Sequence, residues 1–285
     1  MEIIYNVLSV IYYAVTLGDK IDMKNEFSKF NISEEILKAV DGLGYKKPSE
    51  VQEKVIPEII LNKDVIVKSQ TGSGKTAAFA IPICEKVDWN ENAPQVLVLS
   101  PTRELAVQVS EDFVNIGRFK RIKSVAVFGK QPISEQARAL KQKTHVVCGT
   151  PGRVLDHIDR GSLDVKKIKY FVIDEADEML NMGFIDDIEE IIKELPSQEE
   201  RQTLLFSATM PQQIKKLAQN YLKKDYKVVN IKKVSMTVSK ITQGFFEVNP
   251  KTKFEAFCRV LDLETPASSI IFCKTKRGEI GRAHV

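Results

Sequence analysis

The sequence lacks the cysteine pattern of a disulfide-rich or zinc-binding protein. Its 285 residues include four cysteines, which lie far apart and form no C-x-x-C pair. Each one sits in an apolar run, so we expect buried thiols in a reducing compartment rather than disulfides or metal ligands. The four are Cys84, Cys148, Cys258 and Cys273. This cysteine usage leads us to expect a cytoplasmic protein.

The sequence also lacks a strong net charge. The formal net charge is +4, with 43% hydrophobic and 28% charged residues, which is ordinary for a soluble globular protein. So small a positive excess permits a polyanionic partner without demonstrating one, because solvated lysine-rich faces produce it too. A chain of this length can form one large α/β domain or two smaller ones.

No confident membrane span or signal peptide is present. Residues 1–21 are largely apolar, but Asn6 and Ser9 interrupt the run, and a basic n-region is missing. We interpret residues 1–22 as a non-native or upstream extension, with Met23 as the natural start. A weak membrane anchor is the alternative, and our expectation is no membrane partner.

The stretch VIVKSQTGSGKT, residues 65–76, is typical of a nucleotide-binding turn. A short β-branched run precedes a glycine-rich turn, and an apolar-periodic segment follows it, which predicts strand, phosphate loop and helix. Lys75 is then placed to reach the β- and γ-phosphates, and the Thr76 hydroxyl to ligate Mg²⁺. Ser69 stands where the usual pattern begins with glycine. The alternative is a chance match or a simple helix cap.

Apolar runs and amphipathic segments then alternate along the chain. Runs of this kind separated by helices indicate a parallel sheet covered on both faces. The predicted strands are residues 65–67, 96–100, 124–128, 145–148, 170–174, 203–207 and 228–231. Because such folds bind ligands at the carboxyl ends of strands, the informative residues should follow these runs.

Polar motifs do follow several of these runs. Asp174 and Glu175 come after YFVI, and such an acidic pair suits Mg²⁺ and an attacking water, although an exposed acidic turn is the alternative. The loops at 101–106 and 149–153 each offer a helix N-terminus, a hydroxyl and an arginine, an arrangement that suits a phosphodiester. Plain helix capping with a solvated arginine is their alternative. SAT at 207–209 follows another run.

Taken in order, these segments resemble the motifs of the DEAD-box ATP-dependent RNA helicases, over about residues 27–276. The resemblance implies a RecA-like P-loop domain that binds ATP and Mg²⁺. Gln52 would hydrogen-bond the adenine edge, as in the Q motif, and Phe27 would pack on the base. The residues implied to bind nucleotide are Phe27, Tyr45, Lys47, Gln52, Ser69, Gln70, Thr71, Gly72, Ser73, Gly74, Lys75 and Thr76.

The same resemblance implies roles for the later motifs. Lys75, Thr76, Asp174 and Glu175 would be catalytic, with Asp174 and Thr76 holding Mg²⁺ and Glu175 as the base. The residues implied to grip the RNA backbone are Pro101, Thr102, Arg103, Gly129, Thr150, Pro151, Gly152 and Arg153. Those implied to couple nucleotide state to RNA binding are Asp177, Ser207, Ala208 and Thr209. Backbone contacts carry no base code, so we expect no sequence specificity from this core.

One loop departs from the family pattern. The family usually has Gly-Gly after the run that ends at Phe128, whereas this chain has Gly129 followed by Lys130. The close backbone approach that a second glycine allows is therefore in question. The segments FGKQP and DEADEMLNMGF are similar to those of the bacterial DbpA/YxiN-type branch of the family. This similarity implies ribosomal RNA as a partner and a role in ribosome assembly.

The resemblance also implies a domain organisation. Residues 23–224 would form the first RecA-like domain, 225–239 a linker, 240–277 the start of a second RecA-like domain, and 278–285 a foreign tail. The second-domain motifs that supply arginine fingers are not in this sequence. We therefore expect the chain as given to bind ATP and Mg²⁺ as a monomer but to turn over little.

Alternative functions remain open at this point. The first is an ATP-dependent RNA helicase that separates short duplexes. The second is an ATP-gated RNA clamp or assembly factor, in which hydrolysis only releases the RNA. The third is a DNA-directed motor with the same phosphate loop, which the Q motif and the PTRELA and TPGR loops disfavour.

Overall fold

The computed structural model describes residues 25–70, 72–231, 244–249 and 251–272 of the chain. The chain divides into two compact units, residues 1–234 and 235–285. None of the helices in the described ranges is long and apolar enough to cross a membrane. Both the membrane-anchor alternative for residues 1–22 and the foreign tail at 278–285 lie outside the described residues.

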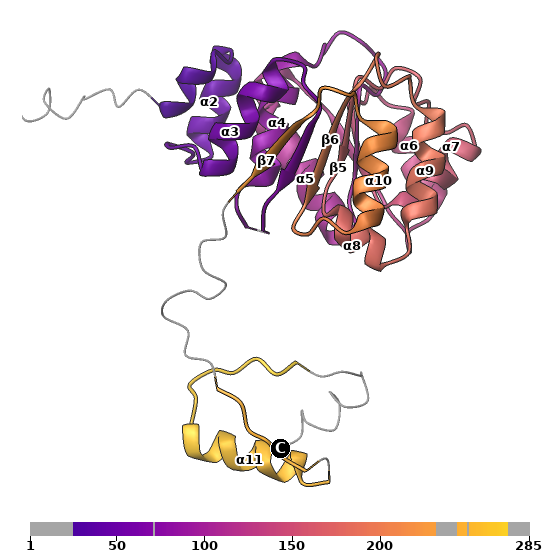
Figure 1. The fold of residues 1–285 in the computed structure, drawn as a ribbon. Coiled ribbons are helices and arrows are strands. Elements are labelled where there is room, and N and C mark those ends of the chain that lie inside the picture. Colours follow the sequence, from indigo (N-terminus) through magenta and orange to yellow (C-terminus); the bar gives the residue numbers. More distant parts are fainter. Residues whose placement is uncertain (1–24, 71, 232–243, 250, 273–285) are drawn as a thin grey trace, which may run out of the picture. The chain divides into compact units, whose positions relative to one another are not determined.

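The first unit alternates strands and helices (Figure 1). Its elements are η1 (Glu26–Phe30), α2 (Glu34–Gly42), α3 (Glu50–Ile60), β1 (Val65–Lys68), α4 (Lys75–Lys86), β2 (Val96–Leu99), α5 (Arg103–Ile116), η2 (Arg118–Lys120), β3 (Ser124–Val127), α6 (Ile133–Leu140), β4 (Val146–Gly149), α7 (Pro151–Asp159), β5 (Tyr170–Ile173), α8 (Ala176–Asn181), α9 (Ile185–Glu194), β6 (Gln202–Ser207), α10 (Gln212–Tyr221) and β7 (Lys227–Asn230). Each apolar run interpreted as a strand contributes one.

The strands form one seven-stranded sheet in the order β3-β4-β2-β5-β6-β1-β7. Every pairing is parallel; for example, Val67 of β1 lies opposite Phe206 of β6, and Val98 of β2 opposite Val172 of β5. This confirms the predicted parallel sheet. Because all strands run the same way, the loops that follow them meet at one edge of the sheet, the carboxyl edge.

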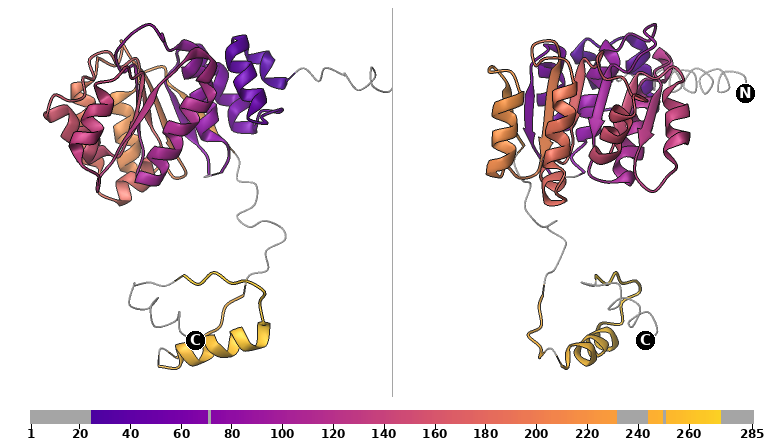
Figure 2. Two further views of the ribbon diagram at one scale, coloured as in Figure 1. Left: turned by 180° about the vertical axis from the view of Figure 1, so that it is seen from behind. Right: turned by 90° about the vertical axis from the view of Figure 1, so that its right-hand side faces the viewer.

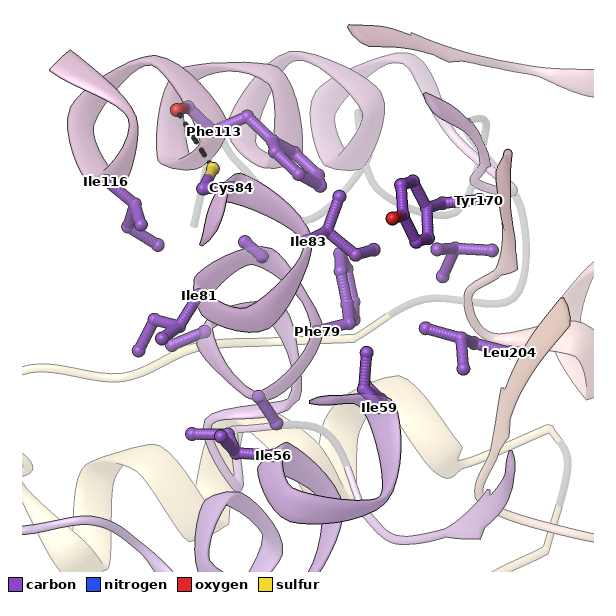
Figure 3. Packing of buried hydrophobic residues seen from close by; sticks show 14 of the residues in the cluster. Ile56, Ile59, Phe79, Ile81, Ile83, Cys84, Phe113, Ile116, Tyr170 and Leu204 are labelled. Atoms are coloured by element: carbon purple, nitrogen blue, oxygen red, sulfur yellow. Dashed lines mark hydrogen bonds between the residues drawn. The ribbon is translucent and has the colours of Figure 1, made fainter. Parts of the chain in front are cut away.

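Both faces of the sheet are buried, because successive strand side chains point to opposite sides. Val65 and Val67 belong to one apolar cluster with α3, α4 and α5, and Figure 3 shows Ile59, Phe79 and Phe113 of these helices converging there. Ile66, between the two valines, belongs to a second cluster. That cluster includes residues of α7, α8, α9 and α10, so helices cover both faces (Figure 2).

The predicted linker begins later than residue 225. Residues Lys227 to Asn230 form β7, which pairs with β1 from Val65↔Lys227 to Lys68↔Asn230. The compact unit extends to Val234. The resemblance placed a linker at 225–239, but β7 is an edge strand that pairs on one side and leaves most of its side chains exposed. A linker assignment from 225 was therefore wrong for the stretch that forms β7.

The described residues of the second unit contain one helix, α11 (Lys253–Glu264). No strand forms in the described residues 244–249 and 266–272. A strand needs a neighbour for its backbone N–H and C=O groups, and none pairs with these segments in the described part of the chain. Phe245 and Phe272 are accordingly exposed. Cys258 of α11 is half-buried rather than buried, unlike Cys84 and Cys148, and Cys273 lies outside the described residues.

Candidate functional site

The phosphate loop joins the carboxyl end of β1 to the start of α4. Gly72 and Gly74 have φ angles of 76° and 89°, a region in which residues with a Cβ are strained. A Cβ on Gly74 would also lie 2.8 Å from Gln52 Nε2. The loop conformation therefore requires glycine at residue 74. Thr71 lies outside the described residues.

Gln52 fastens α3 to this loop. Its Oε1 accepts a hydrogen bond from the backbone N–H of Ser49 (2.8 Å), which closes the capping box of α3, and its Nε2 donates to the carbonyl of Gly74 (3.2 Å). The Ser49 hydroxyl donates to the carbonyl of Ser73 (3.0 Å). Gln52 is buried and does not line the cavity described below. In this structure it positions the phosphate loop.

Of the two aromatic side chains expected to bind nucleotide, Tyr45 lines the cavity described below and Phe27 does not. Phe27 is 0% exposed and packs in the core against Phe30 and Tyr45, whose ring centroids lie 5.9 and 6.4 Å away. Tyr45 is half-buried and lines the cavity. Phe27 therefore supports Tyr45 from behind rather than packing on a base. Lys47, also expected to bind nucleotide, is exposed and does not line the cavity.

A cavity of 420 Å³ opens between the phosphate loop, α5 and the carboxyl end of β5. Its lining joins residues that are distant in sequence. They are Tyr45, Gly72, Gly74, Lys75, Thr76, Ala77, Leu105, Gln108, Asp112, Asp174 and Glu175. This cavity therefore brings together the four residues implied to be catalytic, Lys75, Thr76, Asp174 and Glu175.

Two buried polar atoms in this cavity make no hydrogen bond to any described residue: Lys75 Nζ and Asp174 Oδ1. Leaving a buried polar group without a partner costs ~1–3 kcal/mol, and more for a charged group. Such atoms are therefore rare in folded proteins unless they bind a ligand or an ion. An ammonium suits a phosphate and a carboxylate suits a hydrated divalent cation. The donor set therefore fits a nucleotide with Mg²⁺.

No group of three or more His, Cys, Asp or Glu side chains gathers as a metal site in the described ranges. Magnesium does not need one, since it is commonly held by one or two carboxylates together with phosphate oxygens and water. Asp174 and the Thr76 hydroxyl could provide the protein side of such a site, and both line the cavity.

The environment of Asp174 disfavours its charged form. Burial raises the pKa of this carboxyl to about 6; Lys75 opposes that rise and the Glu175 carboxylate adds to it. The backbone N–H of Asp174 donates to the carbonyl of Leu99 in β2 (2.9 Å), which fixes the residue at the end of β5. A positive ion beside Oδ1 would relieve the desolvation cost.

Glu175 is held in an unusual backbone conformation. Its φ and ψ are 55° and 50°, in the left-handed region, and it occupies the N-cap of α8. A non-glycine residue with such angles stores strain and is found disproportionately at functional sites. The turn leaves Glu175 at the cavity next to Asp174.

Asp177 connects the DEAD segment to the SAT segment after β6. Its Oδ2 accepts hydrogen bonds from the Thr209 backbone N–H and hydroxyl, both at 2.8 Å, and its Oδ1 accepts one from the Ala208 N–H at 3.4 Å. The Asp177 N–H donates to the Ser207 hydroxyl (3.3 Å), which donates to the Thr209 carbonyl (2.6 Å). Burial raises the pKa of Asp177, but these bonds outweigh it and hold the pKa below its ordinary value.

The loop after β2 presents polar groups at the same sheet edge. Thr102 caps α5, its hydroxyl accepting from the Leu105 N–H (3.3 Å), and it remains exposed. Arg103 is exposed too, and its guanidinium lies 4.7 Å from the ring centroid of Phe128. Pro101 is buried and shapes the turn. Thr102 and Arg103 are thus accessible to a ligand at this edge.

The loop after β4 differs from expectation at Arg153. Its Nη1 donates to the Gln131 carbonyl (2.9 Å) and to Gln136 Oε1 (3.0 Å), and its side chain is only 13% exposed. In this structure Arg153 therefore holds the loop before α6 instead of presenting a free cation. The sequence does not indicate this, because one acceptor comes from the loop before α6 and the other from α6 itself. Thr150 stands at the N-cap of α7 with no side-chain cap bond.

The other members of these loops are small. Pro151 is buried at the start of α7, and a Cβ on Gly152 would lie 3.3 Å from Asp187 Oδ2. Gly129 is exposed, with open space around it. Lys130, where the family usually has glycine, has a φ of 62°. It therefore adopts the left-handed backbone that a glycine would favour, despite its side chain.

The sequence analysis missed the part of the cavity formed by α5. Leu105, Gln108 and Asp112 lie three and four residues apart, so they share one face of this helix, and all line the cavity. Burial raises the pKa of Asp112, and the Glu111 carboxylate adds to it. The helical spacing after PTRE was the available signal, but it indicated only a face and not what that face contacts.

A family comparison decides what this arrangement belongs to. Residues 49–217 match the model of the DEAD/DEAH box helicase family. The chain belongs to this family. The matched range includes Gln52, the phosphate loop, Asp174, Glu175 and the SAT segment.

Relatives and solved structures agree with the assignment. The chain is 54% identical over 252 residues to "ATP-dependent RNA helicase DbpA" of Bacillus subtilis, covering 88% of this chain and 52% of that protein. It is 49% identical to "DEAD-box ATP-dependent RNA helicase CshA" of Geobacillus kaustophilus over 88% of this chain and 53% of the relative. This DEAD-box chain thus spans about half the length of the curated relatives it matches.

The fold comparison supports the RecA-like class. A crystal structure of a DEAD box protein from Methanococcus jannaschii is similar, with a TM-score of 0.70 and 41% identity over 90% of this chain and 69% of the other. A hypothetical ATP-dependent RNA helicase from Sulfolobus tokodaii gives a TM-score of 0.64 at 39% identity, covering 70% of this chain and 57% of that one.

Proposed function

We propose that this chain is the ATP-binding part of an ATP-dependent RNA helicase, an RNA-dependent ATPase that locally separates RNA duplexes. One observation carries the proposal: Lys75 Nζ and Asp174 Oδ1 lie buried and unpartnered in the same cavity. Family membership implies use of a nucleotide. A site for phosphate beside a site for a divalent cation is the arrangement that a nucleoside triphosphate requires.

In this mechanism, Lys75 binds the β- and γ-phosphate oxygens, and the backbone N–H groups of the phosphate loop wrap the chain of phosphates. Asp174 and Thr76 would hold Mg²⁺, which would neutralise negative charge on the phosphates. Glu175, at the cavity beside Asp174, orients the attacking water and accepts its proton. Tyr45 provides an aromatic surface toward the base.

Asp177 is well suited to couple hydrolysis to RNA. It lies two residues beyond Glu175 and bonds the Thr209 segment, so a shift of the DEAD turn moves the loop after β6. The adjacent loops that carry Thr102, Arg103 and Thr150 then bind the RNA sugar-phosphate backbone, without base specificity. Ribosomal RNA as the substrate, a monomeric state and a cytoplasmic location are parts of the same proposal.

The test compares ATP hydrolysis with and without single-stranded RNA. The 285-residue chain is measured beside the same chain continued through a complete second RecA-like domain. We expect RNA-stimulated hydrolysis and duplex separation from the continued chain and little turnover from the shorter one, because an arginine from the opposite domain contributes about 10³–10⁵ in rate in related sites. A continued chain that hydrolyses ATP equally with and without RNA would contradict the proposal.

Glu175→Gln gives the matched control in the continued chain. The substitution keeps the size of the side chain but removes the proton acceptor. We expect ATP and RNA binding to persist and turnover to fall by about 10²–10⁴, the range typical of a general base. A variant that hydrolyses at close to the wild-type rate would remove Glu175 from this role.

A further inference from the structure

A second cluster of side chains lies at the opposite edge of the sheet, where the strands begin. Three loops meet there: residues 87–95 lead into β2, residues 117–123 lead into β3, and residues 141–145 lead into β4. These strands are neighbours in the order β3-β4-β2. The loops expected to bind RNA follow the carboxyl ends of the same strands. The cluster at the amino ends is therefore separate from the site described above.

Trp89 is the centre of one half of the cluster. It is 40% exposed, with the Arg121 guanidinium 5.6 Å and the Lys143 ammonium 5.2 Å from its ring. Its backbone is fixed by His145: Nδ1 accepts from the Lys123 N–H (2.9 Å), so Nε2 carries the proton and donates to the Trp89 carbonyl (3.0 Å). The indole is therefore held at the surface rather than in the core.

Phe119 repeats this arrangement in the other half. It is also 40% exposed, with Lys38 Nζ 4.8 Å and the Arg118 guanidinium 4.7 Å from its ring centroid. Arg118 and Arg121 begin and cap the single turn of η2, so they join both halves into one surface. We call it the basic aromatic patch: Lys38, Trp89, Arg118, Phe119, Arg121 and Lys143.

No ion pair joins a cation of the patch to a carboxylate in the described part of the chain. Glu85 accepts from Ser33 and lies 3.8 Å from Lys120, and Glu91 pairs with Lys167 and Lys169. Exposed aromatic rings flanked by unpaired cations are the combination that binds single-stranded nucleic acid. The rings and guanidinium planes stack on bases, and the charges meet phosphates.

We propose that the basic aromatic patch binds single-stranded RNA, as a contact additional to the helicase loops and independent of nucleotide. Bases stack on Trp89 and Phe119, while Arg118, Arg121, Lys38 and Lys143 neutralise the phosphates. An acidic protein segment would use the charges but has no planar groups to stack on two exposed rings, so RNA fits the patch better. The site tethers RNA beside the unwinding core.

The single tryptophan of the sequence makes the test specific, because intrinsic fluorescence reports on this patch. A 12-nucleotide oligouridylate is titrated into the 285-residue chain without ATP, and both Trp89 fluorescence and RNA anisotropy are recorded. We expect quenching that saturates together with the anisotropy. RNA that binds by anisotropy without altering Trp89 emission would overturn the proposal.

The test variant combines Arg121→Gln with Lys143→Gln and keeps Trp89 as the fluorescent probe. Glutamine is chosen because it keeps a side-chain stem at Arg121, whose φ is 56°. The matched control, Lys193→Gln with Lys216→Gln, removes the same charge from exposed positions on α9 and α10. We expect RNA affinity to fall about tenfold in the test variant. The slope of log K against log salt should fall by about 1.4, since each single-strand phosphate contact contributes about 0.7. Equal affinity in the two variants would contradict the patch.

Further measurements separate this inference from the proposed function. Arg103→Gln should reduce the binding of RNA that requires an ATP analogue while leaving the nucleotide-free quenching of Trp89 intact. The test variant and the matched control should both bind ATP like the wild type, which confirms their fold. If polyglutamate of equal charge quenched Trp89 with the affinity of the RNA, the surface would be one for acidic proteins and the RNA assignment would be wrong.

Discussion

Two aspartates of the DEAD segment should respond to the same substitution with opposite changes in stability. Asp174 Oδ1 is buried without a partner, whereas both oxygens of Asp177 accept hydrogen bonds from the loop after β6. Replacing either carboxylate with its neutral amide keeps the shape of the side chain. We expect Asp174→Asn to stabilise the free protein and Asp177→Asn to destabilise it.

The size of the Asp174 effect follows from its pKa, which burial raises from 3.8 to about 6. One pKa unit corresponds to ~1.4 kcal/mol, so keeping this carboxylate charged at pH 7.5 costs the folded protein about 3 kcal/mol. Asparagine resembles the protonated carboxyl, so this value already includes the lost attraction to Lys75. Its own unpaired amide reduces the gain, and we expect an increase of about 1–3 kcal/mol in the free energy of unfolding.

The pH dependence has a definite sign. A folded-state pKa above the unfolded value means that ionised Asp174 destabilises the protein fully above pH ~6, and that this cost disappears as the pH falls toward 3.8. The advantage of Asp174→Asn should shrink over that window. Asp177 behaves oppositely: its folded pKa is lowered, so its stabilisation is present above 3.8 and is lost as the pH falls further. Its replacement should cost about 1 kcal/mol at neutral pH.

Urea unfolding in EDTA, followed by Trp89 fluorescence, measures both changes in the first unit. EDTA is needed because a bound cation would neutralise the charge on Asp174. The reasoning about Asp174 would be refuted if Asp174→Asn lowered the free energy of unfolding at pH 7.5. It would also be refuted if the advantage of this variant grew as the pH was lowered from 6 to 4.

Two substitutions and one thiol measurement test individual positions. Gly74→Ala puts a Cβ at a φ of 89° and 2.8 Å from Gln52 Nε2, so we expect a loss of about 1–2 kcal/mol in urea unfolding and ATP binding weakened about tenfold by calorimetry. Gly149→Ala puts a Cβ 2.6 Å from Val127 Cγ2 inside the sheet, which should cost about 1–3 kcal/mol by overpacking. Burial raises the pKa of Cys148 to about 12, so its thiol should react with Ellman's reagent only after unfolding.

Each of these has a control in the same chain. Gly129→Ala is the control for Gly149→Ala, because a Cβ at Gly129 meets open space and should leave the free energy of unfolding unchanged. A similar loss in Gly129→Ala and Gly149→Ala would contradict overpacking as the cause. ATP binding that survives Gly74→Ala at wild-type strength would show that the loop tolerates another backbone conformation. Cys258 is half-buried and should react in the folded protein, and equal reaction rates for Cys258 and Cys148 would contradict the buried thiol.

The sequence was informative where one pattern determined one structure. Near-continuous apolar runs predicted every strand of the sheet, because a parallel sheet covered on both faces leaves little choice of residue. The carboxyl-edge rule then brought Lys75 and Asp174 together before any coordinates were considered. β7 shows the limit: its run was recognised as a strand, but the resemblance placed the same residues in a linker.

The remaining features depend on contacts between distant segments. Phe27 reads as a free aromatic beside a nucleotide motif, yet it fills the core because Tyr45 covers it. Arg153 reads as a phosphate ligand, yet Gln131 before α6 and Gln136 within α6 bind it. The helical spacing of α5 indicates one face of the helix, but not that this face lines the cavity. Residue types gave the chemistry in each case, and only the fold decides which partner is present.

The central claim is that Lys75 and Asp174 form one site, with Lys75 for phosphate and Asp174 for the metal ion. Calorimetric titration of ATP, with Mg²⁺ and with EDTA, tests it most directly on the wild type, Lys75→Ala and Asp174→Asn. We predict that Mg²⁺ strengthens ATP binding to the wild type, that Asp174→Asn binds ATP but gains nothing from Mg²⁺, and that Lys75→Ala loses ATP binding in both conditions. An undiminished gain from Mg²⁺ in Asp174→Asn would contradict the account.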